Sequence, residues 1–243
     1  LWTGFNQLYN ELASFYYRSN GEWNCPIVIR MPCGGFIQGG PYHSQNIEAF
    51  LAHCPGLKIV IPSNSADAKM LLKSAIRDPN PVIFLEHKAL YRQRVFAAKK
   101  EPTQYEIIPL GVANVVKTGS AITLVTWGLT VHMSYDVSLK LEEEGISVEI
   151  IDLRTICPLD MGTIIKSIKK TGKCLVVHEA QRTGGFGAEI LASISEKVFE
   201  YLDAPLRRLC SLDTCVPYAK HLEDTVLPQK QDIEKEIRSL FSY

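Results

Sequence analysis

The chain has 243 residues, of which 46% are hydrophobic and 21% charged, the composition of an ordinary globular protein. A disordered tail, a collagen-like rod and a coiled coil are excluded, and the length suits one large domain or two modest ones. Lysine plus arginine and aspartate plus glutamate both number 26, which argues against nucleic acid as a partner. No apolar run reaches the length of a membrane span, so no membrane is expected as a partner either.

The charge is divided unevenly along the chain. Residues 1–100 carry 11 basic and 6 acidic side chains, whereas residues 101–243 carry 15 basic and 20 acidic ones. This asymmetry indicates two units of different character. Seven cysteines lie scattered without CxxC spacing, which predicts reduced thiols and a cytoplasmic (bacterial) or mitochondrial-matrix location.

The first half alternates predicted helices and strands. Apolar residues at three- and four-residue spacings predict an amphipathic helix over residues 3–18. Further helices are predicted to begin at Ser44 and at Ser63 or Ser65, because serine is a favoured N-cap. Strands are predicted over residues 26–30, 57–61 and 81–86. Short strands that alternate with capped helices indicate a mostly parallel sheet covered on both faces.

The second half repeats this alternation after a polar, basic stretch over residues 88–109, which we interpret as a linker. Strands are predicted over residues 122–126, 148–153, 174–178 and 206–210. Helices are predicted over residues 130–144, 160–171, 186–201 and 229–241. Both halves are therefore expected to be α/β.

The segment from Gly39 to Gln45, GGPYHSQ, holds the strongest candidate for chemistry. Two glycines and a proline allow a sharp turn after a predicted strand. His43 is then expected immediately before a helix N-terminus, at the sheet edge where ligand sites gather. A histidine in that place is able to carry protons near neutral pH. The alternative is a loop histidine bonded to the backbone, which the local pattern alone favours.

The segment Asp78-Pro79-Asn80-Pro81 follows a predicted helix at its negative pole. Carbonyl groups freed at the helix end, together with the side-chain oxygens of Asp78 and Asn80, suit a hard cation. A plain helix-stop turn explains the same residues, and it is the simpler interpretation of this pattern alone.

Two further motifs lie in the second half. TGGFGAE, beginning at Thr183, follows a strand and opens a helix, but Ile190 stands where a dinucleotide fingerprint requires glycine, so we reject NAD binding. We expect these glycines to allow close packing at a domain or subunit contact. His178 and Glu179 are adjacent on a predicted strand and should point to opposite faces. The sequence has no zinc-ligand spacing, nucleophile elbow or P-loop.

Several segments together resemble the beta subunit of thiamine-diphosphate-dependent 2-oxo acid dehydrogenases. These segments are GGPYHSQNIEAF, AIRDPNP, HKALYR, IDLRTICPLD, HEAQRTGGFGAEI and LDTCVPYAKHLED. The resemblance covers nearly the whole chain, in order. It implies an α/β fold with an incomplete transketolase-type pyrimidine-binding domain over residues 1–95, a linker over 96–111 and a transketolase C-terminal α/β domain over 112–243.

The resemblance also implies an activity and its site residues. Such enzymes decarboxylate a 2-oxo acid oxidatively and pass the acyl unit to lipoamide, with thiamine diphosphate and magnesium as cofactors. His43 matches the family's active-site histidine. Ala75, Asp78 and Asn80 match a structural potassium-binding turn. The implied partners are an alpha subunit or alpha region, a second beta subunit and a lipoylated dihydrolipoyl acyltransferase.

The sequence also departs from the family's pattern. The carboxylate that activates the cofactor lies upstream of the position that matches Leu1, so no cofactor-binding residue is assigned here. The chain is therefore expected to be a trimmed product or the tail of a fused alpha/beta polypeptide, inactive alone, which associates through an exposed strand edge.

The substrate and two other functions stay open. GGxYHSQ and HEAxxTGGF resemble branched-chain members most, whereas HKALYR and LDTxxPYA also occur in pyruvate and acetoin relatives. More distant alternatives are a transketolase-like sugar-phosphate enzyme, and a non-catalytic assembly module whose acidic second half suits a basic partner.

Overall fold

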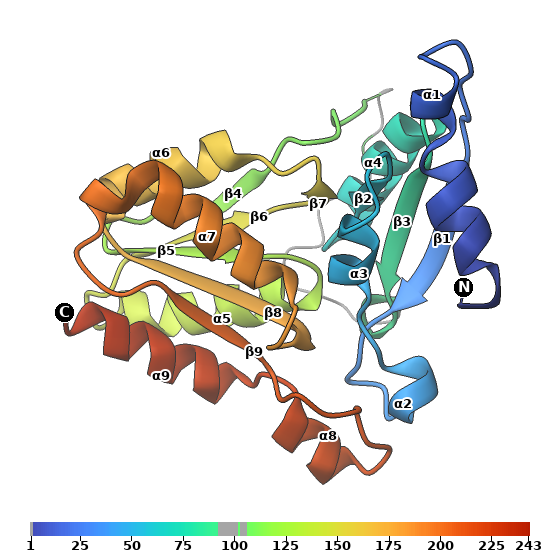
Figure 1. Cartoon of the computed structure of the whole chain (residues 1–243). Coiled ribbons are helices and arrows are strands. Elements are labelled where there is room, and N and C mark those ends of the chain that lie inside the picture. The colour runs from blue at the N-terminus through green and yellow to red at the C-terminus, as the bar shows by residue number, and fades with distance from the viewer. Residues whose placement is uncertain (1, 92–101, 103–105) are drawn as a thin grey trace.

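Two β-sheets organise the chain, and helices cover both of them (Figure 1). The computed structural model describes residues 2–91, 102 and 106–243. Most of the predicted linker therefore lies outside the described residues. The α/β class expected from the sequence is confirmed.

The first sheet has the strand order β1-β3-β2-β7. Its strands are β1 (Val28–Cys33), β2 (Lys58–Val60), β3 (Val82–His87) and β7 (Thr155–Cys157). The first three are parallel, as predicted, whereas β7 comes from the second half and pairs antiparallel with β2. The helices of this half are α1 (Phe15–Arg18), α2 (Gly40–His43), α3 (Glu48–Ala52) and α4 (Ser65–Arg77). The expected division at residue 112 stays a prediction, and one strand beyond it completes the first sheet.

The second sheet has the strand order β4-β6-β5-β8-β9. Its strands are β4 (Asn114–Lys117), β5 (Ile122–Thr126), β6 (Val148–Asp152), β8 (Cys174–Gln181) and β9 (Arg207–Ser211). All are parallel except β4, which pairs antiparallel with β6. The helices are α5 (Leu129–Glu142), α6 (Met161–Thr171), α7 (Phe186–Val198), α8 (Lys220–Val226) and α9 (Lys230–Phe241). Helices α6 and α7 cover one face of the sheet, and α5 and α9 cover the other (Figure 1).

Local structure differs from the predictions at several points. The predicted helix over residues 3–18 is interrupted into short pieces, the last of which is α1, and the Ser14 hydroxyl donates to the carbonyl oxygen of Asn10 at the break. The N-cap of α4 is Asn64, whose Oδ1 accepts from the backbone N–H of Asp67 at 2.9 Å. The short elements β4, β7 and α8 were not predicted, because a few residues give no clear hydrophobic period.

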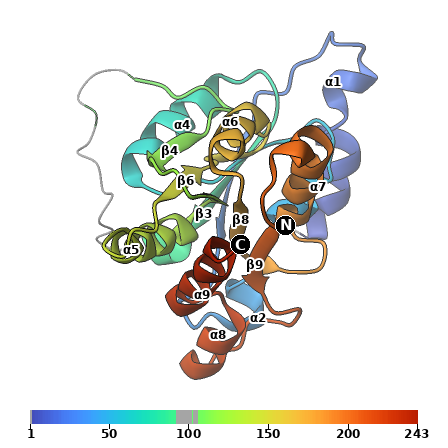
Figure 2. The ribbon, with the colours of Figure 1, turned by 90° about the vertical axis from the view of Figure 1, so that its left-hand side faces the viewer.

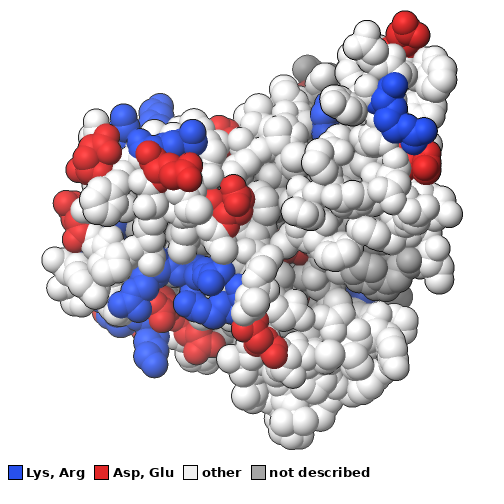
Figure 3. Space-filling model, in the orientation of Figure 1, with Lys and Arg blue, Asp and Glu red and all other residues white. Residues whose placement is uncertain are grey.

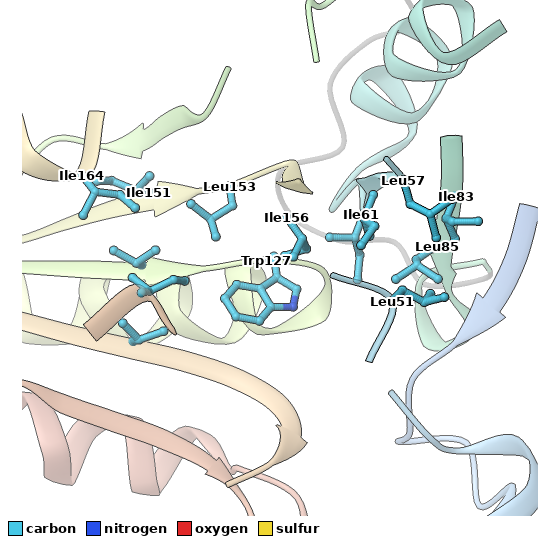
Figure 4. Close-up of a cluster of buried hydrophobic side chains, with 14 of the residues drawn as sticks. Leu51, Leu57, Ile61, Ile83, Leu85, Trp127, Ile151, Leu153, Ile156 and Ile164 are labelled. Atoms are coloured by element: carbon cyan, nitrogen blue, oxygen red, sulfur yellow. The ribbon is translucent and has the colours of Figure 1, made fainter. Parts of the chain in front are cut away.

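One apolar cluster joins the two halves (Figure 4). It contains Leu51, Ile61, Ile83 and Leu85 from the first half and Trp127, Ile151, Leu153 and Ile156 from the second. All of these side chains are at most 3% exposed. A polar group buried beside such a cluster is costly unless it has a hydrogen-bond partner. The buried polar groups at this boundary between the two halves, and their hydrogen-bond partners, define the candidate site.

Candidate active site

A glycine-rich loop leaves β1 and carries His43. Four of its residues have positive φ angles, namely Gly34 (88°), Phe36 (61°), Gln38 (56°) and Gly40 (61°). When left-handed residues alternate with ordinary ones, successive backbone N–H groups point to the same side and form an anion-binding nest. The loop is closed at its base by a hydrogen bond of 3.1 Å from the Gly34 N–H to the carbonyl oxygen of Gln45.

His43 is the last residue of the short helix α2, and it is exposed. His43 was predicted to lie immediately before a helix that begins at Ser44, and this prediction is wrong. The next helix begins at Glu48, because the buried Ser44 hydroxyl accepts from the N–H of Gly39 at 3.1 Å instead of capping a helix. No described residue forms a hydrogen bond with the His43 ring, so the imidazole is open to a ligand.

Glu179 is the main polar contact between the two halves at this loop. Its Oε2 lies 2.7 Å from Nε2 of His87, the last residue of β3, and both side chains are at most 6% exposed. Its Oε1 accepts from the Gly35 N–H and, at 3.0 Å, from the side-chain amide of Asn46. Burial raises the pKa of Glu179, but His87 and these donors lower it more, so the net pKa falls below its ordinary value. Glu179 is therefore a carboxylate that holds the loop.

Glu223 is a second carboxylate that contacts the same loop. It lies in the first turn of α8 and is 2% exposed. Its Oε2 accepts from the Gln38 N–H at 3.1 Å, and its Oε1 accepts from the Ile37 N–H at 3.3 Å. Sequence reasoning missed this residue, because its helix was not predicted. Helices α2 and α8 lie side by side in both ribbon views (Figures 1 and 2).

Two glycines of the loop are required by close approach. A Cβ atom at Gly35 would lie 3.2 Å from Oε1 of Glu179, 3.5 Å from Oε1 of Glu223 and 2.5 Å from Leu227 Cδ1. A Cβ atom at Gly40 would lie 2.4 Å from the ring of Tyr218. Only glycine lets the backbone approach these groups so closely.

Glu48 is a buried carboxyl group at the boundary between the two halves. Trp127 Nε1 donates to its Oε1 at 3.3 Å, whereas its Oε2 has no partner among the described residues. Burial raises the pKa of Glu48 to about 7, more than the hydrogen bonds lower it. Glu48 was not among the site residues predicted from the sequence.

His178 and Glu179 face different partners, as their adjacency on a strand predicts. The His178 ring stacks on Trp127 with centroids 5.2 Å apart, and its Nε2 lies 3.2 Å from Cys210 Sγ. Burial, assisted by Arg208, lowers the pKa of His178 to about 4, so the ring is neutral near pH 7. Cβ atoms at Gly185 and Gly187 would lie 2.6 and 2.7 Å from this ring. The close packing predicted for TGGFGAE is present, but it is made against this histidine of the same half.

Some oxygens of the predicted cation-binding turn at Asp78 already have partners within the chain. The Asp78 N–H donates to the carbonyl oxygen of Ala75 at 3.3 Å, and Asp78 Oδ1 accepts from the Asn80 N–H at 3.0 Å. Asp78 Oδ2 forms an ion pair of 2.5 Å with Lys58. The turn therefore ends α4 by itself, and its potassium role stays a prediction. In the part of the chain that the structure describes, no three His, Cys, Asp or Glu side chains form a metal-binding group.

Comparisons with known proteins, together with the fold, show the class of protein to which the chain belongs. Residues 2–94 match the family model of the transketolase pyrimidine binding domain, and residues 111–233 match that of the transketolase C-terminal domain. A solved split-gene transketolase, described as an inactive beta4 tetramer, has a TM-score of 0.78 over 99% of this chain and 72% of its own, at 18% identity. At that identity the likeness concerns the fold alone. The chain is thus of the transketolase type, with these two domains in this order.

Relatives with much higher identity narrow this class. The beta 2 subunit of mitochondrial 2-oxoisovalerate dehydrogenase from Arabidopsis thaliana is 47% identical over 100% of the chain and 67% of its own length. The beta subunit of 2-oxoisovalerate dehydrogenase from Bacillus subtilis is 44% identical over 98% of the chain and 72% of its own. The pyruvate dehydrogenase E1 beta subunit from the same bacterium is 40% identical over 96% and 70%. The chain belongs to this family of 2-oxo acid dehydrogenase beta subunits.

Proposed function

We propose that the chain is the beta part of the decarboxylase component of a 2-oxo acid dehydrogenase complex, with His43 as its proton-carrying catalytic residue. The observation that carries this proposal is the placement of His43. Its imidazole is exposed and unbonded among the described residues, on a loop that two buried carboxylates of the other half hold in place. A positioned, exposed imidazole suits proton transfer to a bound substrate or acyl acceptor.

The cofactor of the proposed reaction is thiamine diphosphate, shared with an alpha subunit or alpha region. When bound, it supplies the carbon nucleophile that cleaves a 2-oxo acid. We assign the magnesium and diphosphate ligands to the alpha part, as the family resemblance implies. Among the described residues, no three His, Cys, Asp or Glu side chains form a metal-binding group. This chain then contributes one wall of the site, and its own chemical group there is His43.

We propose a branched-chain 2-oxo acid as the substrate, with pyruvate or acetoin as the alternative. Identities of 44 to 47% to 2-oxoisovalerate dehydrogenase subunits support this choice over the 40 to 41% to pyruvate dehydrogenase subunits. The difference is small, and an apolar acyl pocket discriminates by only about 1 to 3 kcal/mol per methylene group. The substrate must therefore be measured directly.

The face around α2 suits a protein partner. Residues 31–47 contain no charged side chain, and this part of the surface is uncharged in Figure 3. Tyr42 is 82% exposed beside His43, and Tyr218 and Leu222 are about half exposed on the adjacent segment. An exposed apolar patch with few charges is typical of an interface. We assign it to the alpha part, with a second beta subunit and the lipoylated acyltransferase as further partners.

We also propose a bacterial cytoplasmic or mitochondrial-matrix location. Relatives of both mitochondrial and bacterial origin support it. Among the helices that the structure describes, none combines the length and apolar character that a bilayer crossing needs.

The test is turnover by the complete assembled enzyme, with its alpha part, thiamine diphosphate and magnesium. Pyruvate, branched-chain 2-oxo acids and acetoin are offered separately, with an artificial electron acceptor. We expect turnover of branched-chain acids to exceed that of pyruvate and acetoin. If a preparation that binds the cofactor turns over none of these substrates, the proposed function is contradicted. A preference for pyruvate would contradict only the proposed substrate.

A further inference from the structure

Two buried carboxylates of the other half of the chain contact the loop that carries His43. Glu179, on β8, accepts from the N–H at the start of the loop, and Glu223, on α8, accepts from two N–H groups in its middle. Gly35 lies between them, since its Cβ position is within 3.5 Å of an oxygen from each carboxylate. Two acidic side chains therefore converge on one glycine-rich segment.

Nearby like charges repel each other, so their convergence requires a compensating group. The described residues place no lysine or arginine in an ion pair with either carboxylate, and His87 faces Glu179 alone. Within the described part of the chain, the hydrogen-bond donors to Glu223 are backbone N–H groups of the loop. Phe36 and Gln38, which flank and include these N–H groups, adopt left-handed φ angles of 61° and 56°, a conformation that is uncommon for residues other than glycine.

The strained geometry and the carboxylate depend on each other. If Glu223 lost its charge, the nest would lose its anion, and the loop would be free to relax from its left-handed angles. The position of His43 depends on this segment, because α2 begins at Gly40, two residues after Gln38. We infer that Glu223 is a positioning residue for His43, acting through the N–H groups of Ile37 and Gln38. This inference rests on the proposed function, in which His43 carries a proton.

The test variant is Glu223→Gln in the assembled enzyme. Glutamine keeps the shape of the side chain and removes its charge, so folding should persist. Asp224→Asn is the matched control, because Asp224 is the neighbouring residue on α8 and, among the described residues, its recognised partner is Lys220, at 2.6 Å. If Glu223→Gln does not assemble, Glu223→Asp shortens the side chain and carries the same measurements.

Two measurements separate positioning from a general structural effect. Hydrogen exchange of the peptide covering residues 34–46 should be faster in Glu223→Gln and unchanged in Asp224→Asn. The kcat of Glu223→Gln should fall by about tenfold or more, with KM changed less, because a small misplacement of a catalytic group is enough to lose such a factor. In a His43→Asn background, Glu223→Gln should cause no further loss, because the two residues would act through one group.

The outcomes are distinguishable. Unchanged exchange of the loop in Glu223→Gln would overturn the anchoring. An equal loss of kcat in the presence and absence of His43 would overturn positioning, because Glu223 would then act by another route. Full turnover by His43→Asn alone would overturn the proposed role of His43, while the exchange measurement would still report whether Glu223 holds the loop.

Discussion

Glu179 and His87 form a buried pair, 2.7 Å apart, that joins a strand of the second sheet to the end of a strand of the first. His87 is the last residue of β3, and Glu179 lies within β8. The same carboxylate also binds the base of the loop that carries His43. One side chain therefore contributes both to the contact between the two halves and to the geometry of the candidate site.

Replacing Glu179 should destabilise the fold. Glu179→Ala leaves the donors on Gly35, Asn46 and His87 unpaired, and we expect a loss of about 3 kcal/mol in the free energy of unfolding at pH 7. Because folding lowers the pKa of Glu179, its contribution is present above its ordinary pKa of 4.5 and is lost as pH falls through the lower folded value. Urea unfolding at pH 7 and pH 4 measures this, with the exposed Glu189→Ala as control. Equal losses in both variants would contradict the prediction.

Glu48 should give the opposite dependence on pH. Its folded pKa of about 7 lies above its ordinary value of 4.5, so the wild type loses stability as pH rises from 4.5 and the loss is complete above 7. Glu48→Gln has no such loss. Its stability relative to wild type should therefore increase by roughly 3 kcal/mol between pH 4.5 and pH 8. Urea unfolding across this range measures the difference, and the exposed Glu200→Gln should show none. A flat difference for Glu48→Gln would refute the raised pKa.

His43→Asn should impair turnover without unfolding the protein. Loss of a positioned proton-transfer group typically lowers kcat by about 100-fold or more, whereas an exposed side chain contributes little to stability. Steady-state kinetics of the assembled enzyme and a thermal melt measure the two effects. His221→Asn, an exposed histidine on α8, is the control that should leave both unchanged. A wild-type kcat in His43→Asn would remove this residue from the mechanism.

The potassium site proposed at Ala75, Asp78 and Asn80 predicts an ion-specific stability. A cation that binds only the folded chain raises the melting temperature, so potassium buffer should give a melting temperature a few degrees above sodium buffer. Asp78→Ala should abolish this difference. Because Asp78 also pairs with Lys58, the control is Lys58→Met, which removes the ion pair and keeps the oxygens. Identical melting temperatures of the parent protein in the two buffers would rule the site out.

The alternation of strands and helices was predictable because it rests on local patterns. Short apolar runs such as residues 59–61 and 82–85 mark buried parallel strands whatever surrounds them. The short elements were not predictable in this way. Strand β7 has three residues, and it is a strand only because β2 offers an unpaired edge beside it. The predicted beginning of α3 was wrong, because the Ser44 hydroxyl accepts a hydrogen bond from the loop residue Gly39 instead of capping a helix.

By itself, the sequence determined the α/β class, the family and the candidacy of His43, because repeated spacing and distinctive motifs need no knowledge of contacts. Only the tertiary structure decided what holds His43 in place. Glu179 and Glu223 are separated from the loop residues they bind by 144 and by 185 or 186 positions. No periodicity in the sequence links groups so far apart. They meet because the sheet order and the shared apolar core bring β8 and α8 against the loop, where buried N–H groups and carboxylates require each other.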